Sequence, residues 1–159
     1  MGEPLMTEID HLAEELDLEL ASFDQADAFA LGTLLYGKAV ALAQGGGVVD
    51  IRTASNVLFH AALGGATADN DAWIERKSAA ALRFQASTVR IAQTIEGRGD
   101  PHASGWLDNT RYALIGGAFP IRVAGAGVVA VVTTSGLGHP DDEHRLLVDT
   151  VREFRDSRR

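Results

Sequence analysis

The sequence predicts an α+β domain whose strands form an antiparallel sheet. Two segments of alternating apolar residues, 48–53 and 57–63, are separated by a short turn, and a second hairpin, rich in β-branched residues, lies within residues 119–135. Segments with helical periodicity precede, separate and follow these two hairpins. The 159 residues are enough for one domain, 1–159, with a substantial core.

Two helices are expected before the first strand. The first, residues 7–18, is short, acidic and amphipathic, with one apolar side made of Ile9, Leu12, Ala13 and Leu16. The second begins after the stretch from Ser22 to Gln25, which has the capping-box pattern, and runs to about Ala43. Apolar residues surround most of this second helix, so we expect it to be buried.

The alternation of apolar residues in the first hairpin predicts its register. The apolar face carries Val49, Ile51, Thr53, Val57, Phe59 and Ala61. Matching the two strands on that face requires an odd number of loop residues, so we expect a three-residue loop, 54–56, that places Asp50 directly opposite His60. The other face then holds Asp50, Arg52 and His60 beside Leu58, and this polar trio either faces solvent or forms part of a site.

The later elements follow from caps and composition. Asp69 or Asn70 is expected to cap a helix that contains Trp73, Ile74, Lys77 and Ala81, and residues 87–95 form another helix. Residues 97–105 are expected to be a loop. The last helix begins near Pro140, because the first helical position tolerates proline, and its acidic start and arginine-rich end complement the helix dipole.

The second hairpin contains a glycine pattern that needs its own interpretation. Gly125-Ala-Gly127-Val-Val-Ala130 is a variant of the dinucleotide-binding fingerprint. In a nucleotide site such glycines open a helix whose N-terminal amides contact the phosphates. Here β-branched residues, which are typical of a strand, follow the glycines. The pattern therefore indicates a glycine-rich turn and not a nucleotide site.

Composition and charge argue against several kinds of partner. The net charge is −8 and no Lys or Arg precedes Lys38, so no nucleic-acid partner is expected. No apolar run is long enough to span a bilayer, and the acidic start does not resemble a secretory signal, so we expect no membrane partner. The absence of cysteine excludes disulfides and thiolate chemistry. We expect a cytoplasmic location.

Several stretches resemble the haem-degrading domain family. They are FHAALGGATADNDAWIERK (59–77), GGAFPIRV (116–123), and GVVAVVTTSGL (127–137) followed by EHRLLV (143–148). The likeness is greater to the largely uncharacterised intracellular branch of this family, within the GlcG-like superfamily, and it covers about residues 23–154. The resemblance implies a profilin-like fold, with a five-stranded antiparallel sheet flanked by helices, and it implies a homo-oligomer.

The chain departs from the family pattern at two places. Ala130 stands where the family usually has glycine, and Glu143-His144 stands where it usually has Asp-His. The second change keeps a carboxylate beside a histidine. Haem-binding relatives give the family its name, but no position here matches their axial ligand.

Five residues are candidates for contacting a ligand. His60 can ligate haem iron or transfer protons near neutral pH, or it can pair with Asp50 within the sheet. Arg76 and Lys77 can clamp a carboxylate, such as a haem propionate or a small organic acid, or form ion pairs across a subunit interface. Ser135 and Gly136 form a turn whose amides can face a pocket or the next subunit.

Two other groupings do not support a site. Ser135, Asp142 and His144 lack the G-x-S-x-G setting of a serine nucleophile, so no catalytic residue is identified. His139 and His144 are five residues apart and not the four that bring two ligands onto one helical face, so we expect no metal site.

The sequence leaves three functional hypotheses open. The first is an oligomeric, cytoplasmic module that binds a small ligand, with haem and a small organic acid as candidates. The second is a non-catalytic interaction or scaffold protein, and the third is a haem-cleaving enzyme, which only the family resemblance supports. In the oligomer we expect the helix containing Trp73 at or near a subunit contact, with residues 1–37 and the basic region 76–90 paired within or between chains.

Overall fold

The computed structural model describes residues 9–95 and 98–158, and within them it contains one four-stranded antiparallel sheet. In chain order the elements are α1 (His11–Asp17), α2 (Gln25–Leu42), β1 (Val48–Arg52), β2 (Val57–Ala62), α3 (Ala68–Phe84), α4 (Thr88–Ile95), β3 (Ala118–Val123), β4 (Gly127–Ser135) and α5 (Pro140–Asp156). The strands lie in the order β2-β1-β4-β3. The predicted α+β class is confirmed.

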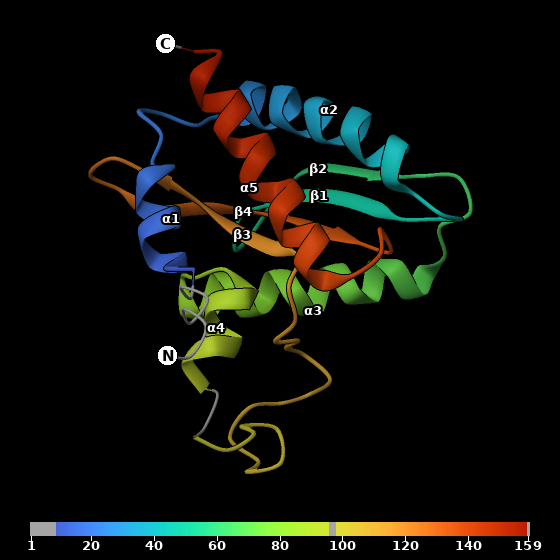
Figure 1. Cartoon of the computed structure of the whole chain (residues 1–159), viewed down its shortest axis with the longest axis vertical. Coiled ribbons are helices and arrows are strands. Elements are labelled where there is room, and N and C mark those ends of the chain that lie inside the picture. The colour runs from blue at the N-terminus through green and yellow to red at the C-terminus, as the bar shows by residue number, and fades with distance from the viewer. Residues whose placement is uncertain (1–8, 96–97, 159) are drawn as a thin grey trace, which may run out of the picture.

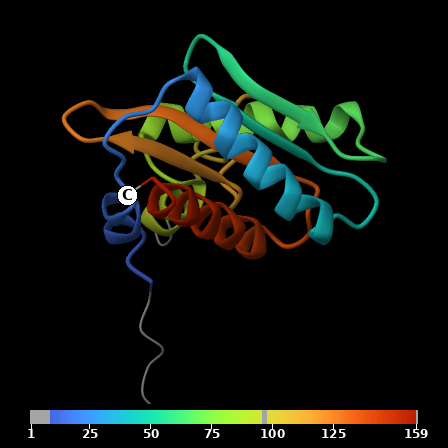
Figure 2. The ribbon, with the colours of Figure 1, turned by 90° about the horizontal axis from the view of Figure 1, so that it is seen from above.

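Helices cover both faces of the sheet (Figure 1). The α2 and α5 helices lie side by side on one face, as Figure 2 also shows, and α3 lies on the other. The α1 helix contacts β3 and α4. No helix in the described part of the chain is both long and apolar enough to cross a membrane.

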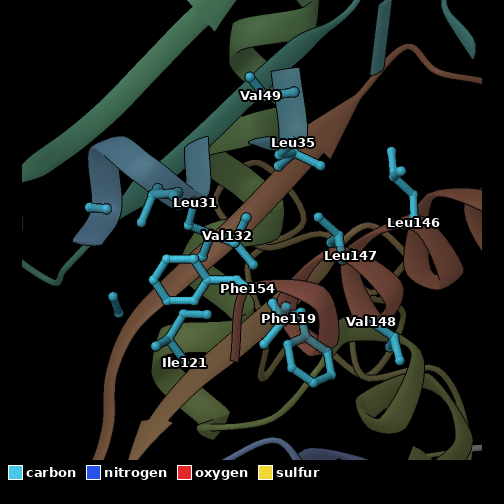
Figure 3. Close-up of a cluster of buried hydrophobic side chains, with 14 of the residues drawn as sticks. Leu31, Leu35, Val49, Phe119, Ile121, Val132, Leu146, Leu147, Val148 and Phe154 are labelled. Carbon is cyan, nitrogen blue, oxygen red and sulfur yellow. The ribbon is translucent and has the colours of Figure 1, made fainter. Parts of the chain in front are cut away.

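The main core lies between the sheet and the α2–α5 layer (Figure 3). Its fully buried side chains include Leu31, Leu35, Ile51, Phe119, Ile121 and Leu147. Burying a side chain of this size contributes about 1.5–3 kcal/mol. The expectation that α2 is buried holds for the side that faces this core, whereas Phe29, Tyr36 and Val40 on another side are exposed.

The predicted register of the first hairpin is confirmed. Asp50 pairs with His60, and the neighbouring apolar pairs are those expected. A bulge after Ile51 then pairs Arg52 with Val57, so the connection spans residues 53–56 and not 54–56. The bulge lies beyond the pair of Asp50 and His60, which share one face of the sheet, the face that α3 covers.

The glycine pattern of the second hairpin is a turn, as predicted. Gly125 and Gly127 have φ angles of 79° and 76°, which only glycine adopts without strain, and they connect β3 to β4. A strand and not a helix follows Gly127, so no helix N-terminus faces a phosphate there. The predicted start of α5 at Pro140 is also confirmed.

The five-stranded sheet implied by the family resemblance is wrong for this chain. Among residues 9–95 and 98–158 the sheet has four strands, and Leu20 adds only an isolated bridge to Val123 at its edge. The edge strand β3 contains Pro120, which has no N–H to offer a further strand.

Three helix starts differ from the prediction. The cap of α2 is Asp24, in reciprocal bonding with Asp27, and not Ser22. The cap of α3 is Thr67, whose amide donates to the Asn70 side chain. Asp10 caps α1, whereas the predicted start of that helix, Thr7, lies outside the described residues. In each case a nearby side chain of equal capping ability competes, and local sequence does not decide between them.

Candidate functional site

His60 lies between two carboxylates on the face of the sheet that α3 covers. Its Nδ1 is 2.7 Å from an oxygen of Asp50 on the neighbouring strand, and its Nε2 is 3.0 Å from an oxygen of Asp71 in the first turn of α3. The His60 side chain is 34% exposed, and that of Asp71 is 53% exposed. Asp50 has no exposed surface. The His60 ring is therefore held on its buried side by Asp50 and contacted on its exposed side by Asp71.

Asp50 is also held by Arg52. The Nε and Nη2 atoms of Arg52 each donate to one Asp50 oxygen at 2.7 Å. These hydrogen bonds are the main reason why the pKa of Arg52 lies above its ordinary value, against the opposing effect of burial. The polar trio of Asp50, Arg52 and His60 thus forms one connected hydrogen-bond network. These partners offset the free-energy cost of burying the Asp50 carboxylate.

The region around His60 carries more negative than positive charge. Asp50 and Asp71 contact the ring, and Glu75, one turn after Asp71, also acts on Arg52 through its charge. A groove of about 310 Å³ beside this network is lined by Arg52, Glu75 and the hairpin turn. The sequence pattern did not single out Asp71, because the α3 face that meets the sheet depends on how the helix packs.

Ser135 and Gly136 support the start of α3. Ser135 Oγ donates to the Asn70 carbonyl at 2.9 Å. Gly136 has a φ of 76°, and a Cβ there would lie 2.7 Å from the Asn70 side-chain nitrogen. The turn therefore packs against the residue that precedes Asp71, and it lies in the same region as His60. Ser135 is engaged with Asn70, whereas His144 contacts Glu14, so the two do not form a nucleophile–base pair.

Lys77 is buried and paired with Glu143 of α5. Its Nζ lies 3.0 Å from Glu143 Oε2 and also donates to the Thr134 carbonyl. Burial lowers the pKa of Lys77, and the charge of Glu143 and its hydrogen bond oppose that shift. Glu143 also accepts from Thr134 Oγ1 and from the Leu137 amide. The ammonium group is therefore occupied inside the protein.

Arg76 points away from Lys77. Its guanidinium donates to the backbone and side-chain oxygens of Asn109 at 3.0 and 3.1 Å, and it stacks 4.6 Å from the centre of the Trp73 ring. Consecutive residues of a helix diverge by about 100°, so the two cations do not converge on one carboxylate. The structure thus brings His60, Ser135 and Gly136 to one region, while Arg76 faces elsewhere.

A second cluster was not anticipated. His11 and Glu14 of α1 meet His144 of α5, and their ligating atoms all lie within 4.8 Å of one another. Burial raises the pKa of Glu14, but hydrogen bonds from His144 and His11 outweigh it, so the pKa lies below its ordinary value. Glu14 and His144 are 130 residues apart in sequence. The spacing of His11 and Glu14 on one helical face was the only local signal.

Known proteins are similar to this chain in sequence over most of its length. A family model described as "Haem degrading protein HbpS-like" matches residues 23–151. A UPF0303 protein of Streptomyces avermitilis is 43% identical over 146 residues, which cover 89% of this chain and 86% of that protein.

Two solved structures are also similar. The crystal structure of the Ybr137w protein has a TM-score of 0.85 and 29% identity, and the match covers 94% of this chain and 87% of that one. The crystal structure of a PduOC complex with haem has a TM-score of 0.66 and 15% identity, and it covers 82% of this chain and 94% of that one.

Proposed function

The chain belongs to the HbpS-like haem-degrading family, and we propose that it is an oligomeric module that binds a small ligand, haem, through His60. The observation that carries this proposal is the way His60 is held. Asp50 bonds to Nδ1 from the buried side, which leaves Nε2 directed at an exposed partner, Asp71. A histidine that ligates a metal usually donates its other ring N–H to a carboxylate in this manner.

The charge around His60 favours a metal ion such as haem iron, and not a carboxylate group of an organic acid or of a haem propionate, as the partner of His60 Nε2. Asp50, Asp71 and Glu75 outnumber the one guanidinium of Arg52, so a carboxylate ligand is repelled whereas an iron cation is attracted. Asp71 must release Nε2 for iron to bind. An exposed ion pair is worth about 1 kcal/mol or less, so its displacement costs little.

The other predicted contacts have different roles in this proposal. Lys77 is excluded because its ammonium is paired with Glu143, and Arg76 is excluded because it is directed toward Asn109. Ser135 and Gly136 support the first turn of α3 and thereby place Asp71. The PduOC structure supports the choice of ligand only because it shares the fold and was solved as a complex with haem.

Titration of the purified protein with hemin tests the proposal. We expect a shifted Soret band that saturates near one haem per chain, because one His60 is available in each chain. We expect His60→Ala to abolish the shift and His139→Ala to retain it, because His139 is exposed at the start of α5 and contacts nearby Asp141. Absorbance spectroscopy measures both.

The same titration separates the alternatives. The absence of a Soret shift at micromolar hemin, or a shift that His60→Ala leaves unchanged, contradicts binding through His60. A band that forms and then decays after a reductant is added in air supports the haem-cleaving enzyme instead. A band that stays constant under those conditions supports binding without cleavage.

The oligomer is proposed through the exposed side of α2. Phe29 is 66% exposed and Val40 is 54% exposed, and Tyr36 lies between them on the same helical stripe. This stripe adjoins β2, an edge strand, through the contact between Phe29 and Phe59. An apolar stripe beside an open strand edge is a surface suited to a second copy.

Two features that could require a partner chain are satisfied within one chain. The sheet is covered on both faces by helices of one chain (Figure 1). The acidic Glu15 pairs with Arg90 at 2.7 Å within the chain, so this contact between the acidic and basic regions needs no partner. The predicted contact at or near the Trp73 helix stays a prediction, and the α2 stripe is proposed as an interface beside it.

Size exclusion coupled to light scattering measures the assembly. We expect a mass that is a multiple of the single-chain 16.9 kDa, and we expect Phe29→Glu with Val40→Glu to reduce it to one chain. Ile115→Glu, an exposed apolar position in the loop before β3, is the control and is expected to leave the mass unchanged. A single-chain mass for the unmodified protein at micromolar concentration contradicts the oligomer.

A further inference from the structure

Two imidazoles and one carboxylate converge where α1 packs against α5. His11 Nδ1 is 3.1 Å from Glu14 Oε1, and His144 Nε2 is 2.7 Å from the same oxygen. The two rings meet edge to face with their centres 4.9 Å apart. Each histidine is only 6% exposed. The cluster lies outside the His60 region and shares no residue with it.

Contacts along α1 keep the three side chains together. His11 and Glu14 are three residues apart, which places them on one face of the helix. Asp17, one turn later, pairs with Arg152 of α5, and Glu15 is bound by Arg90 at 2.7 and 3.1 Å. The short helix is thus tied to α4 and to α5, and its docking assembles the cluster.

The two histidines of the cluster line a cavity of about 560 Å³. The cavity lies between the start of α1, the helix α4 and the first turns of α5, and its lining residues are Ile9, His11, Val89, Ala92, Gln93, Asp141, His144 and Arg145. Within the part of the chain that the structure describes, His144 Nδ1 is buried without a hydrogen-bond partner. Hydrogen bonding among the described residues therefore accounts for Nε2 of this ring, which contacts Glu14, and not for Nδ1.

We infer that His11, Glu14 and His144 form a binding site for a divalent first-row transition-metal ion. Two histidines and one carboxylate are the ligand set of catalytic zinc sites and of non-haem iron sites. Bonds of about 2.0–2.2 Å place tetrahedral ligands about 3.4 Å apart, and the observed separations approach this spacing, so small side-chain movements suffice. Three protein ligands leave further coordination positions for water or a substrate entering from the cavity.

This inference goes beyond haem binding, because it gives the chain a second ligand site with separate residues. It also departs from the sequence expectation of no metal site, which considered only the His139–His144 segment. Imidazole and carboxylate ligands can bind both zinc and iron. The ligand set therefore specifies a class of ion and not a single element.

Titration of the full chain with Zn²⁺ and Co²⁺, after treatment with a chelator, tests the site. We expect one ion per chain, visible absorption bands from bound Co²⁺, and a melting temperature that rises with Zn²⁺ concentration, because an ion bound to the native state stabilises it. Glu14→Gln keeps an oxygen that can accept from an imidazole but removes the charge. Loss of a group that hydrogen-bonds to a metal ligand weakens metal binding roughly 10- to 100-fold. Because Glu14 is itself a proposed ligand, we expect Glu14→Gln to weaken Zn²⁺ binding by more than this.

His144→Ala and His11→Ala are expected to abolish the Co²⁺ bands, with circular dichroism showing that each variant is folded. His60→Ala and His139→Ala are the matched controls and are expected to keep the bands. Loss of hemin binding in His60→Ala with retained Co²⁺ binding separates this site from the haem proposal. No ion bound at micromolar concentration, or binding that survives in both Glu14→Gln and His144→Ala, overturns the inference.

Discussion

Lys77→Met is expected to lower the free energy of unfolding by about 3–5 kcal/mol, the usual cost of removing one partner of a buried ion pair. The substitution keeps an apolar chain of similar length but leaves the Glu143 carboxylate buried without the ammonium group that lies 3.0 Å from it. The carboxylate keeps hydrogen bonds from Thr134 and Leu137, which do not carry a compensating charge. Urea unfolding with linear extrapolation measures the difference.

Lys38→Met is the matched control for this prediction. Lys38 of α2 pairs with Glu153 of α5, but both side chains are substantially exposed. Water and salt screen such a pair, so we expect the change to cost about 1 kcal/mol or less. Equal losses of unfolding free energy in Lys77→Met and Lys38→Met would show that burial does not make the Lys77–Glu143 pair more important for stability than the exposed pair.

A double variant isolates the buried charge itself. Lys77→Met combined with Glu143→Leu removes both charges, and apolar replacement of a buried ion pair is often close to neutral. We therefore expect the double variant to be more stable than Lys77→Met alone. A double variant that is as unstable as the sum of both single changes would mean that the ammonium and carboxylate act independently.

The hairpins were predictable because residues close together in the sequence determine them. Alternation of apolar residues placed Asp50 opposite His60, and the turn glycines Gly125 and Gly127 marked the second hairpin. A strand face is set by a two-residue period, so a few residues determine the register. His60 and its partner Asp50 were therefore identified correctly from sequence, although Asp71, which comes from a separate helix, was not.

The contacts that were not predicted at Lys77 and at His144 share a physical cause, which is long-range packing. Whether Lys77 faces solvent or Glu143 depends on a residue 66 positions away, and the clamp expected with Arg76 assumed that both cations were exposed. The His11–Glu14–His144 cluster likewise exists only after α1 docks on α5. Sequence spacing predicts which residues are neighbours on one helix or strand. It does not predict a site that is assembled from elements far apart in the sequence.

Gly117→Ala is expected to destabilise the protein by about 2–6 kcal/mol, the sum of backbone strain and steric displacement. Gly117 precedes β3 with a φ of 126°, a conformation that side chains rarely adopt. A Cβ there would lie 2.5 Å from Lys77 Nζ and 2.6 Å from Glu143 Oε2, so the buried pair must move apart.

The comparison with Gly125→Ala separates the two contributions to the Gly117 effect. Gly125 also has a positive φ, of 79°, but nothing lies within 4 Å of the position that an alanine Cβ would take, so only strain of about 1–3 kcal/mol is expected. Because the Gly117 clash is with Lys77, adding Gly117→Ala to Lys77→Met should cost less than adding it to the unmodified protein. Urea unfolding of the four proteins measures this coupling. Strictly additive costs would contradict a direct contact between the Gly117 backbone and the ion pair, because substitutions at contacting residues are expected to couple.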